Sequence, residues 1–353
     1  MIIKEGFARI SVPESHSRKG PGTRSAGFYN NEQVINRDLT ILVLSKLRPK
    51  NYLDGFGATG VRAIRVITEL GIESSISEIN PASVRKIEEN LAMNSVTASV
   101  YKEPFQSAVS KGLYEFIDID PYGSAVPYLD VALASVKNGG YLGITATDLS
   151  ILTGSVPSKT RRRYGAFIAN DAHRHEAGIR LMLADVVKRA ASMDRYIAPI
   201  ISFWHGHFYR IIVRVRNGSL KADKSLDLVS TVNFNKMYSN YYDDIDQGPV
   251  WKGDLEDSSI ISGSLALRPG SVSEMSVNFA SKLIGENASL MFSEMTDAAR
   301  SMGLSLPRVN DLIEELGKTG FTACRTHFST TGIKFSGTWQ QFTEAFVSAS
   351  RRA

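Results

Sequence analysis

From residue 51 onward, short apolar runs alternate with longer stretches of helical periodicity. The apolar runs cover residues 51–54, 74–78, 115–120 and 141–147. A glycine-rich loop at 55–60 and a helix to residue 70 follow the first run, and Pro81 begins the next helix, where proline fits the first turn. This order of strand, helix, strand, helix is typical of βαβ units, so it predicts a parallel sheet with helices on its faces.

The parallel sheet is expected to end in an antiparallel hairpin. A helix over residues 175–193 leads to strands at 196–204 and 208–216, and only residues 205–207 connect those strands. A connection this short joins antiparallel strands. Such an ending is typical of class I methyltransferases, whereas the sheet of a dinucleotide dehydrogenase normally stays parallel. We therefore predict an α/β fold with the Rossmann-like sheet of a class I methyltransferase.

The length of the chain predicts two domains. It has 353 residues, of which 43% are hydrophobic and 22% are charged, as in ordinary globular enzymes. The composition changes after Arg216, so we place one domain at 1–220 and a smaller α+β domain at 221–353. No apolar run approaches the roughly 20 residues that span a bilayer. The first residues also lack the apolar region of a signal peptide, which predicts a cytoplasmic protein.

Cysteine and charge limit the kinds of site that the chain can build. Cys324 is the only cysteine, which excludes an intramolecular disulfide and a multi-cysteine zinc site, and no histidine spacing indicates a metal, so we expect none. The net charge is +5. Basic residues cluster at Arg18, Lys19 and Arg24 and again at Lys159, Arg161, Arg162 and Arg163. These clusters either form one basic face for a polyanion or are solvated charges on unrelated loops.

The glycine-rich loop and a later glutamate predict a site for a nucleoside cofactor. Asp54, Gly55, Gly57 and Thr59 lie between a strand and a helix, where glycine permits a tight turn and close approach of a ligand. Glu78 ends the next strand about 20 residues later, where a carboxylate can accept hydrogen bonds from both hydroxyls of a ribose. NAD enzymes share this kind of loop, and some such loops serve only the fold.

The segment Asp120-Pro121-Tyr122-Gly123, at the end of the fourth strand, marks the expected active site. It is similar to the acid or amide, Pro, Pro, aromatic signature of methyltransferases that act on exocyclic amines. Such an amine shares its lone pair with the ring, so it reacts poorly unless acceptors hold its hydrogens. Asp120 and the Pro121 carbonyl supply acceptors, and Tyr122 supplies a stacking surface worth roughly 1–3 kcal/mol. An ordinary Asp-Pro turn is the alternative.

Asp118 lies two residues before this segment and faces the same side of the strand. Its carboxylate either contributes to the cofactor site and orients the active site, or is a buried and paired carboxylate.

A set of segments between residues 5 and 251 carries a further signal. They are Glu5-Gly6-Phe7-Ala8, Val12-Pro13, Phe28-Tyr29-Asn30, Asn36-Arg37-Asp38, Gly57-Ala58-Thr59-Gly60-Val61-Arg62, Asp118-Ile119-Asp120-Pro121-Tyr122-Gly123-Ser124, Arg162-Arg163-Tyr164-Gly165-Ala166, His175-Glu176 and Gly248-Pro249-Val250-Trp251. In this order they resemble the tRNA (guanine-26-N2) dimethyltransferase family, in an archaeal form. The resemblance implies a class I methyltransferase domain, a C-terminal domain special to the family, S-adenosylmethionine as donor and guanine 26 of tRNA as acceptor.

The resemblance also implies roles for single residues. Arg37 and Arg62 match arginines that contact the cofactor, and Glu78 and Asp120 match the ribose acid and the catalytic carboxylate. The segment that contacts adenine should follow the third strand, where Glu103-Pro104 matches only loosely.

Two further segments bear on substrate and metal. Many relatives carry paired cysteines of a zinc ribbon before the Gly-Pro-Leu/Val-Trp motif, whereas this chain has Tyr238-Ser239-Asn240-Tyr241-Tyr242-Asp243-Asp244 there. Zinc is therefore not expected, and packing of the tyrosines should hold this region. Phe28 and Tyr29 lie between Arg24 and Arg37, a combination that suits nucleic acid and a displaced base, with core packing as the alternative.

We therefore predict an enzyme that transfers one or two methyl groups from S-adenosylmethionine to N2 of guanine 26 in tRNA. The 1–220 domain should include an N-terminal substrate-binding segment, both basic clusters should contact tRNA, and the 221–353 domain should add contacts. An adenine amino-methyltransferase acting on DNA or RNA would use the same site chemistry, and a non-catalytic tRNA-binding protein would keep the same fold. We expect a monomer.

Overall fold

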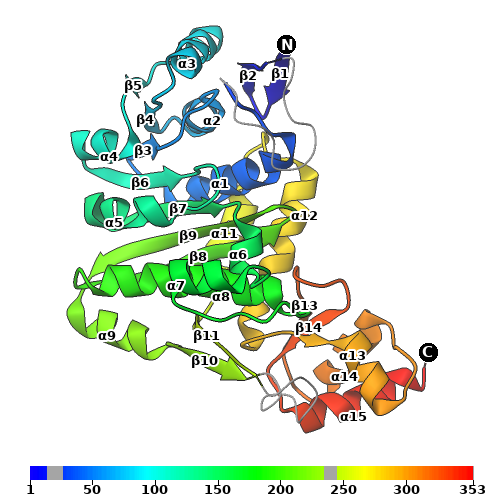
Figure 1. Ribbon diagram of the computed structural model, residues 1–353. Helices are drawn as coiled ribbons and strands as arrows, with labels where there is room; N and C mark the ends of the chain where they lie inside the picture. Colours follow the sequence, from blue (N-terminus) through cyan, green and yellow to red (C-terminus); the bar gives the residue numbers. More distant parts are fainter. Residues whose placement is uncertain (14–26, 234–244, 353) are drawn as a thin grey trace. The chain divides into compact units, whose positions relative to one another are not determined.

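The computed structural model describes residues 1–13, 27–233 and 245–352, and the chain divides into two compact units (Figure 1). The first unit contains Met1–Leu149, Val186–Leu226 and Ser259–Ser281, and the second contains Ser150–Asp185, Asp227–Ser258 and Lys282–Ala353. The domain boundary near residue 220 stays a prediction, because packing alone does not show which segments fold independently. Within the described ranges, no helix is long and apolar enough to cross a membrane.

The first unit is built around a seven-stranded sheet with the order β5-β4-β3-β6-β7-β9-β8. The strands are β3 (Asn51–Asp54), β4 (Glu73–Ser77), β5 (Ser99–Tyr101), β6 (Tyr114–Ile119), β7 (Val136–Ala146), β8 (Arg195–His205) and β9 (Phe208–Asn217). The strands from β5 to β7 pair in parallel, whereas β9 is antiparallel to both β7 and β8. The parallel sheet and its antiparallel terminal hairpin are therefore confirmed.

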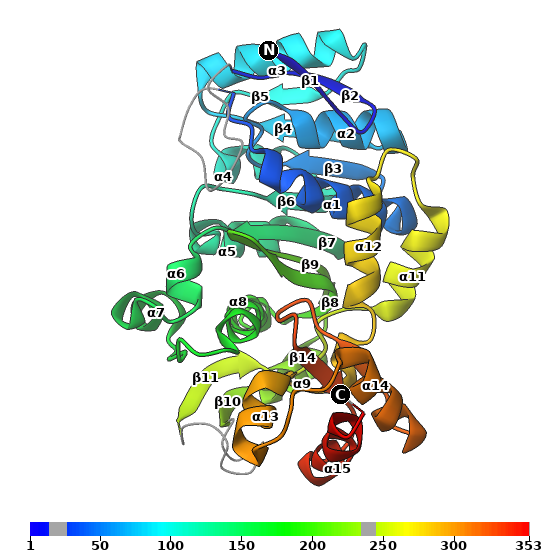
Figure 2. The same ribbon diagram turned by 90° about the vertical axis from the view of Figure 1, so that its right-hand side faces the viewer.

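Helices cover both faces of this sheet. The helices of this unit are α1 (Val34–Leu47), α2 (Val61–Leu70), α3 (Pro81–Met93), α4 (Phe105–Ala108), α5 (Val126–Ser135), α9 (Ser219–Asp227), α11 (Ser258–Leu267) and α12 (Glu274–Leu283). The unit also contains the hairpin of β1 (Ile2–Glu5) and β2 (Ala8–Ser11). Figure 2 shows α1 and α12 on one side of the sheet and α4 and α5 on the other. The Asp38 carboxylate links α1 to the start of α12, because it accepts hydrogen bonds from the hydroxyls of Ser273 and Ser276 at 2.8 Å each.

Local sequence signals set where the helices of the βα units begin. Gly60, immediately before α2, has a φ of 78°, a left-handed conformation that glycine adopts without a Cβ clash. Asn80 caps α3, where its side chain accepts hydrogen bonds from the backbone N–H groups of Ala82 and Ser83, and Pro81 occupies the first turn. These caps place the loops after β3 and β4 at the carboxyl edge of the sheet.

The interior of the first unit contains several buried ion pairs. Arg65 is fully buried and contacts the carboxylates of Glu5 at 2.8 Å, Asp38 at 2.8 Å and Glu69 at 2.7 Å. Arg210 on β9 is fully buried as well, and it pairs with Asp118 on β6 at 2.6 Å. Buried charges persist only when partners compensate their desolvation, so each of these side chains specifies how its element packs.

The second unit combines helices with short antiparallel strands. Its elements are α6 (Leu149–Leu152), α7 (Pro157–Tyr164), α8 (Arg174–Ala191, of which the residues from Val186 on belong to the first unit), β10 (Val229–Asn233), β11 (Asp246–Trp251), β12 (Ser293–Glu294), α13 (Met295–Met302), α14 (Val309–Lys318), β13 (Ala323–Arg325), β14 (Gly332–Phe335) and α15 (Trp339–Ser350). The strands form a β10-β11 pair and a β12-β14-β13 sheet. Phe335, Phe342 and Trp339 stack in its core, and buried Lys334 contacts Glu176 at 2.6 Å. The predicted α+β character is confirmed.

Replacing Arg210 with methionine should destabilise the protein strongly. The Arg210→Met variant leaves a buried carboxylate without its closest cation, so the free energy of unfolding in a urea titration should fall by roughly 3–5 kcal/mol. Arg268→Met is the matched control, because the Arg268–Glu274 pair is solvent-exposed and such pairs contribute about 0–1 kcal/mol. Equal losses in the two variants would show that the buried pair has no special role.

Candidate active site

One cavity lies at the carboxyl edge of the parallel strands in the first unit. Its volume is about 510 Å³, within the roughly 300–1,000 Å³ of ligand pockets. Many of the residues predicted from the sequence line it, namely Phe28, Tyr29, Arg37, Asp54, Gly57, Thr59, Arg62, Glu78, Asp120, Pro121 and Tyr122. Open α/β sheets bind their ligands at this edge.

Glycines in the loop after β3 are required by packing around the cavity. A Cβ on Gly57 would lie 2.4 Å from Ile76 Cγ2, and a Cβ on Gly55 would lie 2.7 Å from the Phe105 ring. Any side chain at either position would therefore displace the loop. Gly55 does not line the cavity itself, so its observed contribution is to let the loop lie against β6 and α4.

Asp54, the last residue of β3, carries an unsatisfied carboxylate oxygen. Its Oδ1 accepts a hydrogen bond from the Phe56 N–H at 3.3 Å, while Oδ2 is buried and has no hydrogen-bond partner among the described residues. Burial raises the pKa of Asp54 to about 7, and the nearby Arg62 guanidinium only partly opposes this effect. The position therefore suits a ligand group that donates a hydrogen bond or carries positive charge.

Glu78 follows β4 and reaches the cavity with both oxygens already ordered. Its Oε2 accepts a hydrogen bond from the Ala58 N–H and its Oε1 accepts one from the Asn80 N–H, each at 2.8 Å. An ionised carboxylate has about four acceptor sites, so it can still accept bonds from a ligand. The side chain is thus held in place by the two loops between which it lies.

Asp120 is paired with Arg62 from α2. The Arg62 Nε donates to Asp120 Oδ2 at 3.0 Å, and Nη2 contacts the same oxygen. No described residue contacts Oδ1, and the Asp120 side chain is 21% exposed. Arg62 therefore orients the carboxylate and leaves one of its oxygens available as an acceptor.

Asp118 lies below this pair and does not line the cavity. Its carboxylate accepts hydrogen bonds from Arg210 Nη1 at 2.6 Å and from the Tyr52 hydroxyl at 2.9 Å. Burial alone would raise the pKa of Asp118, but Arg210 and then Arg62 outweigh it, so the pKa lies below its usual value. Of the two sequence interpretations, the structure matches the buried, paired carboxylate.

Arg37 and Tyr29 border the cavity but are bound to a buried glutamate. Arg37 donates from Nε and Nη2 to the two oxygens of Glu5 at 2.6 Å each, and the Tyr29 hydroxyl donates to Glu5 Oε2 at 2.6 Å. Burial would raise the pKa of Glu5, yet the Arg37 guanidinium outweighs it and lowers this pKa to about 2. Tyr29 is only 3% exposed, which matches core packing.

Two aromatic rings, those of Phe28 and Tyr122, are in contact at the cavity. Phe28 and Tyr122 form an edge-to-face pair with centroids 5.1 Å apart, and Tyr122 is 43% exposed. An exposed ring beside a carboxylate provides a stacking surface for a planar heterocycle.

Comparison with known proteins identifies the family. The model of the N2,N2-dimethylguanosine tRNA methyltransferase family matches residues 6–347. A tRNA (guanine(26)-N(2))-dimethyltransferase from Thermoplasma acidophilum is 48% identical over 95% of this chain and 94% of that protein. The chain belongs to this family.

Further relatives agree over the full length of this methyltransferase. The tRNA (guanine(26)-N(2))-dimethyltransferase from Thermoplasma volcanium is 43% identical and covers 100% of both chains. The solved structure of Trm1 from Pyrococcus horikoshii with S-adenosyl-L-methionine has a TM-score of 0.87 at 27% identity, and the match covers 98% of this chain and 99% of that one.

Some predicted site residues of this methyltransferase lie away from the cavity. Glu103 and Pro104 do not line it; Glu103 contacts Lys111 at 3.3 Å, and Pro104 precedes α4. Lys159, Arg161, Arg162 and Arg163 are exposed on α7 of the second unit. The remaining substrate residues Arg18, Lys19 and Arg24, like the tyrosine-rich segment 238–244, lie outside the described residues.

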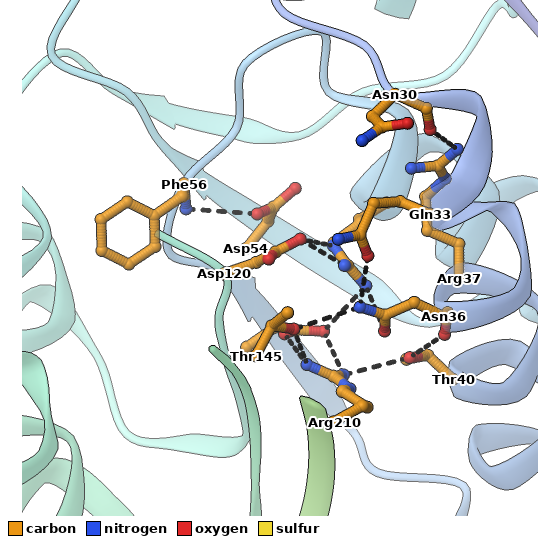
Figure 3. Close-up of polar contacts among 12 residues, drawn as sticks. Asn30, Gln33, Asn36, Arg37, Thr40, Asp54, Phe56, Asp120, Thr145 and Arg210 are labelled. Carbon is orange, nitrogen blue, oxygen red and sulfur yellow. Dashed lines mark hydrogen bonds and ion pairs between the residues drawn. The ribbon is translucent and has the colours of Figure 1, made fainter. Parts of the chain in front are cut away.

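The structure adds residues that sequence reasoning did not select. Asn36 donates to Thr145 Oγ1 at 3.2 Å, and both residues are labelled in Figure 3. The Asn36 Oδ1 accepts from Arg62. Thr147 and His207 line the cavity. Only Arg210 carried a usable signal, because an arginine within the apolar run of β9 requires a buried partner.

The Asp54 carboxyl should titrate near pH 7 in the ligand-free methyltransferase, as measured by carbon-13 NMR of aspartate carboxyls with Asp54→Asn for assignment. Its folded pKa of about 7 exceeds the ordinary 3.8, so its contribution to stability is present at low pH and is lost as the pH rises through about 7. Asp54→Asn should remove that loss. A titration near 4 would contradict the burial argument.

Proposed function

We propose that the chain transfers methyl groups from S-adenosylmethionine to the N2 amine of guanine 26 in tRNA. The two Thermoplasma relatives are named for this activity, and each matches nearly the whole chain. At the level of the site, the proposal rests on one observation: Asp120, Pro121 and Tyr122 share a single cavity with Asp54 and Glu78. The carboxylate proposed to hold the amine, Asp120, and those proposed to bind the cofactor, Asp54 and Glu78, therefore line the same cavity.

The residues present fit S-adenosylmethionine. The buried, unpartnered Asp54 Oδ2 suits an ammonium group, and the Glu78 carboxylate suits vicinal ribose hydroxyls. The loop after β3 contains Gly55 and Gly57, and a larger residue at either position would displace this loop. When bound, this cofactor supplies a methyl group on a positively charged sulfur.

Asp120 and Pro121 are proposed to hold the acceptor amine. The uncontacted Asp120 Oδ1 accepts one amine hydrogen, and the Pro121 carbonyl accepts the other. This grip withdraws the lone pair from the ring and directs it at the methyl carbon. Positioning of two bound reactants can lower a barrier by roughly 7–11 kcal/mol, so Asp120 acts mainly by placement. Arg62 is a positioning residue, because it fixes the opposite carboxylate oxygen.

The same carboxylate is placed to receive a proton. When the amine nitrogen bonds to the methyl carbon, it must release one hydrogen, and the hydrogen held by Asp120 Oδ1 already lies on an acceptor. After one transfer the nitrogen keeps a single hydrogen, which the same groups can hold for a second transfer. Phe28 and Tyr122 provide the rings that keep the guanine plane fixed.

The proposal also includes the contacts with the rest of the tRNA. The exposed cations of α7 contact tRNA, together with Arg18, Lys19 and Arg24, and the 221–353 region adds contacts that are special to the family. A base must leave its stack to reach a cavity of this kind. We further propose that the methyltransferase acts as a monomer in the cytoplasm.

The decisive experiment identifies the methylated nucleoside. Incubation with unmodified tRNA and isotope-labelled donor, followed by digestion and mass spectrometry, should yield N2-methylguanosine and N2,N2-dimethylguanosine, and none from a transcript with adenosine at position 26. Asp120→Ala should reduce turnover by about 100- to 1,000-fold, the usual effect of removing one transition-state hydrogen-bonding group, while it retains donor binding. Methylated adenosine, or full activity of Asp120→Ala, would refute the proposal.

Glu78→Gln should weaken donor binding. The amide oxygen can keep only one of the two backbone N–H bonds that Glu78 accepts, so a thermal melt of the variant checks that the fold is retained. Loss of a charged acceptor costs roughly 1.5–3 kcal/mol, so the donor Kd from calorimetry should rise about 10- to 100-fold. Glu103→Gln is the matched control, since Glu103 does not line the cavity and its Kd should stay at the wild-type value. The ribose assignment fails if Glu78→Gln binds the donor normally.

A further inference from the structure

A second cavity, in the second unit, has no role in the reaction described above. It has a volume of about 500 Å³ and lies where α7 ends. Its lining includes Ser158, Arg161, Gly165, Phe167 and Gly248. Gly165 has a φ of 64°, and a Cβ there would meet nothing within 4 Å, so the surface above it is open.

Phe167 presents its ring to solvent from a fixed backbone. The ring is 43% exposed. The Phe167 N–H donates to the Gly248 carbonyl at 2.9 Å, and the Gly248 N–H donates to the Phe167 carbonyl at 2.7 Å. No other described aromatic ring contacts Phe167. A single exposed apolar residue is ordinary, but this ring lies in a cavity on an anchored strand bridge.

Among the described residues, the helix beside this ring carries cations without carboxylate partners. Arg161 lines the same cavity and is exposed, and Lys159 and Arg162 are exposed on the same helix. In the part of the chain that the structure describes, none of these three makes an ion pair. Like charges on one short helix repel each other, and a polyanion relieves that repulsion.

We propose that this cavity binds a nucleotide of the RNA substrate other than the one that is methylated: its base stacks on Phe167 and its phosphate contacts Arg161. The inference rests on the proposed function, because it takes tRNA as the substrate. A planar base and an adjacent anionic phosphate match an exposed ring and an adjacent guanidinium. Phe167 thus adds a stacking contact to a helix whose charges alone would bind any polyanion.

Two variants separate stacking from charge. Phe167→Ala should raise the Kd for unmodified tRNA by roughly 5- to 100-fold, the effect of losing one base–aromatic stack, and leave the salt dependence of binding unchanged. Arg161→Ala should reduce the slope of log K against log salt by about one unit. Leu220→Ala is the control, because Leu220 is an exposed apolar residue on α9 (77% exposed), and its binding should match the wild type.

A third variant reports the contact directly. In Phe167→Trp, tRNA should quench the new indole fluorescence, whereas an acidic poly-glutamate peptide should not. The inference is overturned if Phe167→Ala binds tRNA like the wild type, or if the peptide alone quenches the indole. Wild-type product analysis is done first: without methylguanosine the proposed function fails, whereas methylguanosine with unaltered Phe167→Ala binding refutes only the second site.

Discussion

The Asp118 carboxylate, enclosed between two guanidinium groups, is the constraint on which the site depends. It is fully buried, with Arg210 on one side and Arg62 Nη1 at 3.7 Å on the other. A lone buried carboxylate would be very costly, so the two arginines stabilise the packing of α2 and β9 against β6. Because Arg62 also donates to Asp120, the same arginine orients the carboxylate that we propose to hold the amine.

Local patterns were sufficient to predict the fold. The strands, the glycine-rich loop and the antiparallel hairpin depend on periodicity and short connections, which are visible over a few residues. The entry of α3 at Pro81 and the turn at Gly60 have equally local causes. Asp54, Glu78 and Asp120 could also be placed, because their position at strand ends brings them to one edge of the sheet.

Pairing between distant charges could not be predicted from the sequence. The resemblance assigns Arg37 and Arg62 to the cofactor; both line the cavity, and the structure adds their partners Glu5 and Asp120. Tyr29 was predicted either to contact a base or to pack in the core, and neither alternative included the hydrogen bond from its hydroxyl to Glu5. Each partner lies many residues away, and no periodicity links the two. Such contacts form only when the elements pack together. The sequence therefore shows which residues are charged, but not which of them pair.

In the proposed mechanism, the Asp120 oxygen that Arg62 leaves uncontacted has a consequence for how the reaction ends. Arg62 occupies Oδ2 with two donors, so the carboxylate offers one acceptor, Oδ1, to the amine. An amine that has received two methyl groups has no hydrogen left to donate. Oδ1 then faces a methyl group, and the attraction that held the substrate becomes a desolvation cost. The dimethylated base is therefore bound more weakly than the substrate, which favours its release after the second transfer.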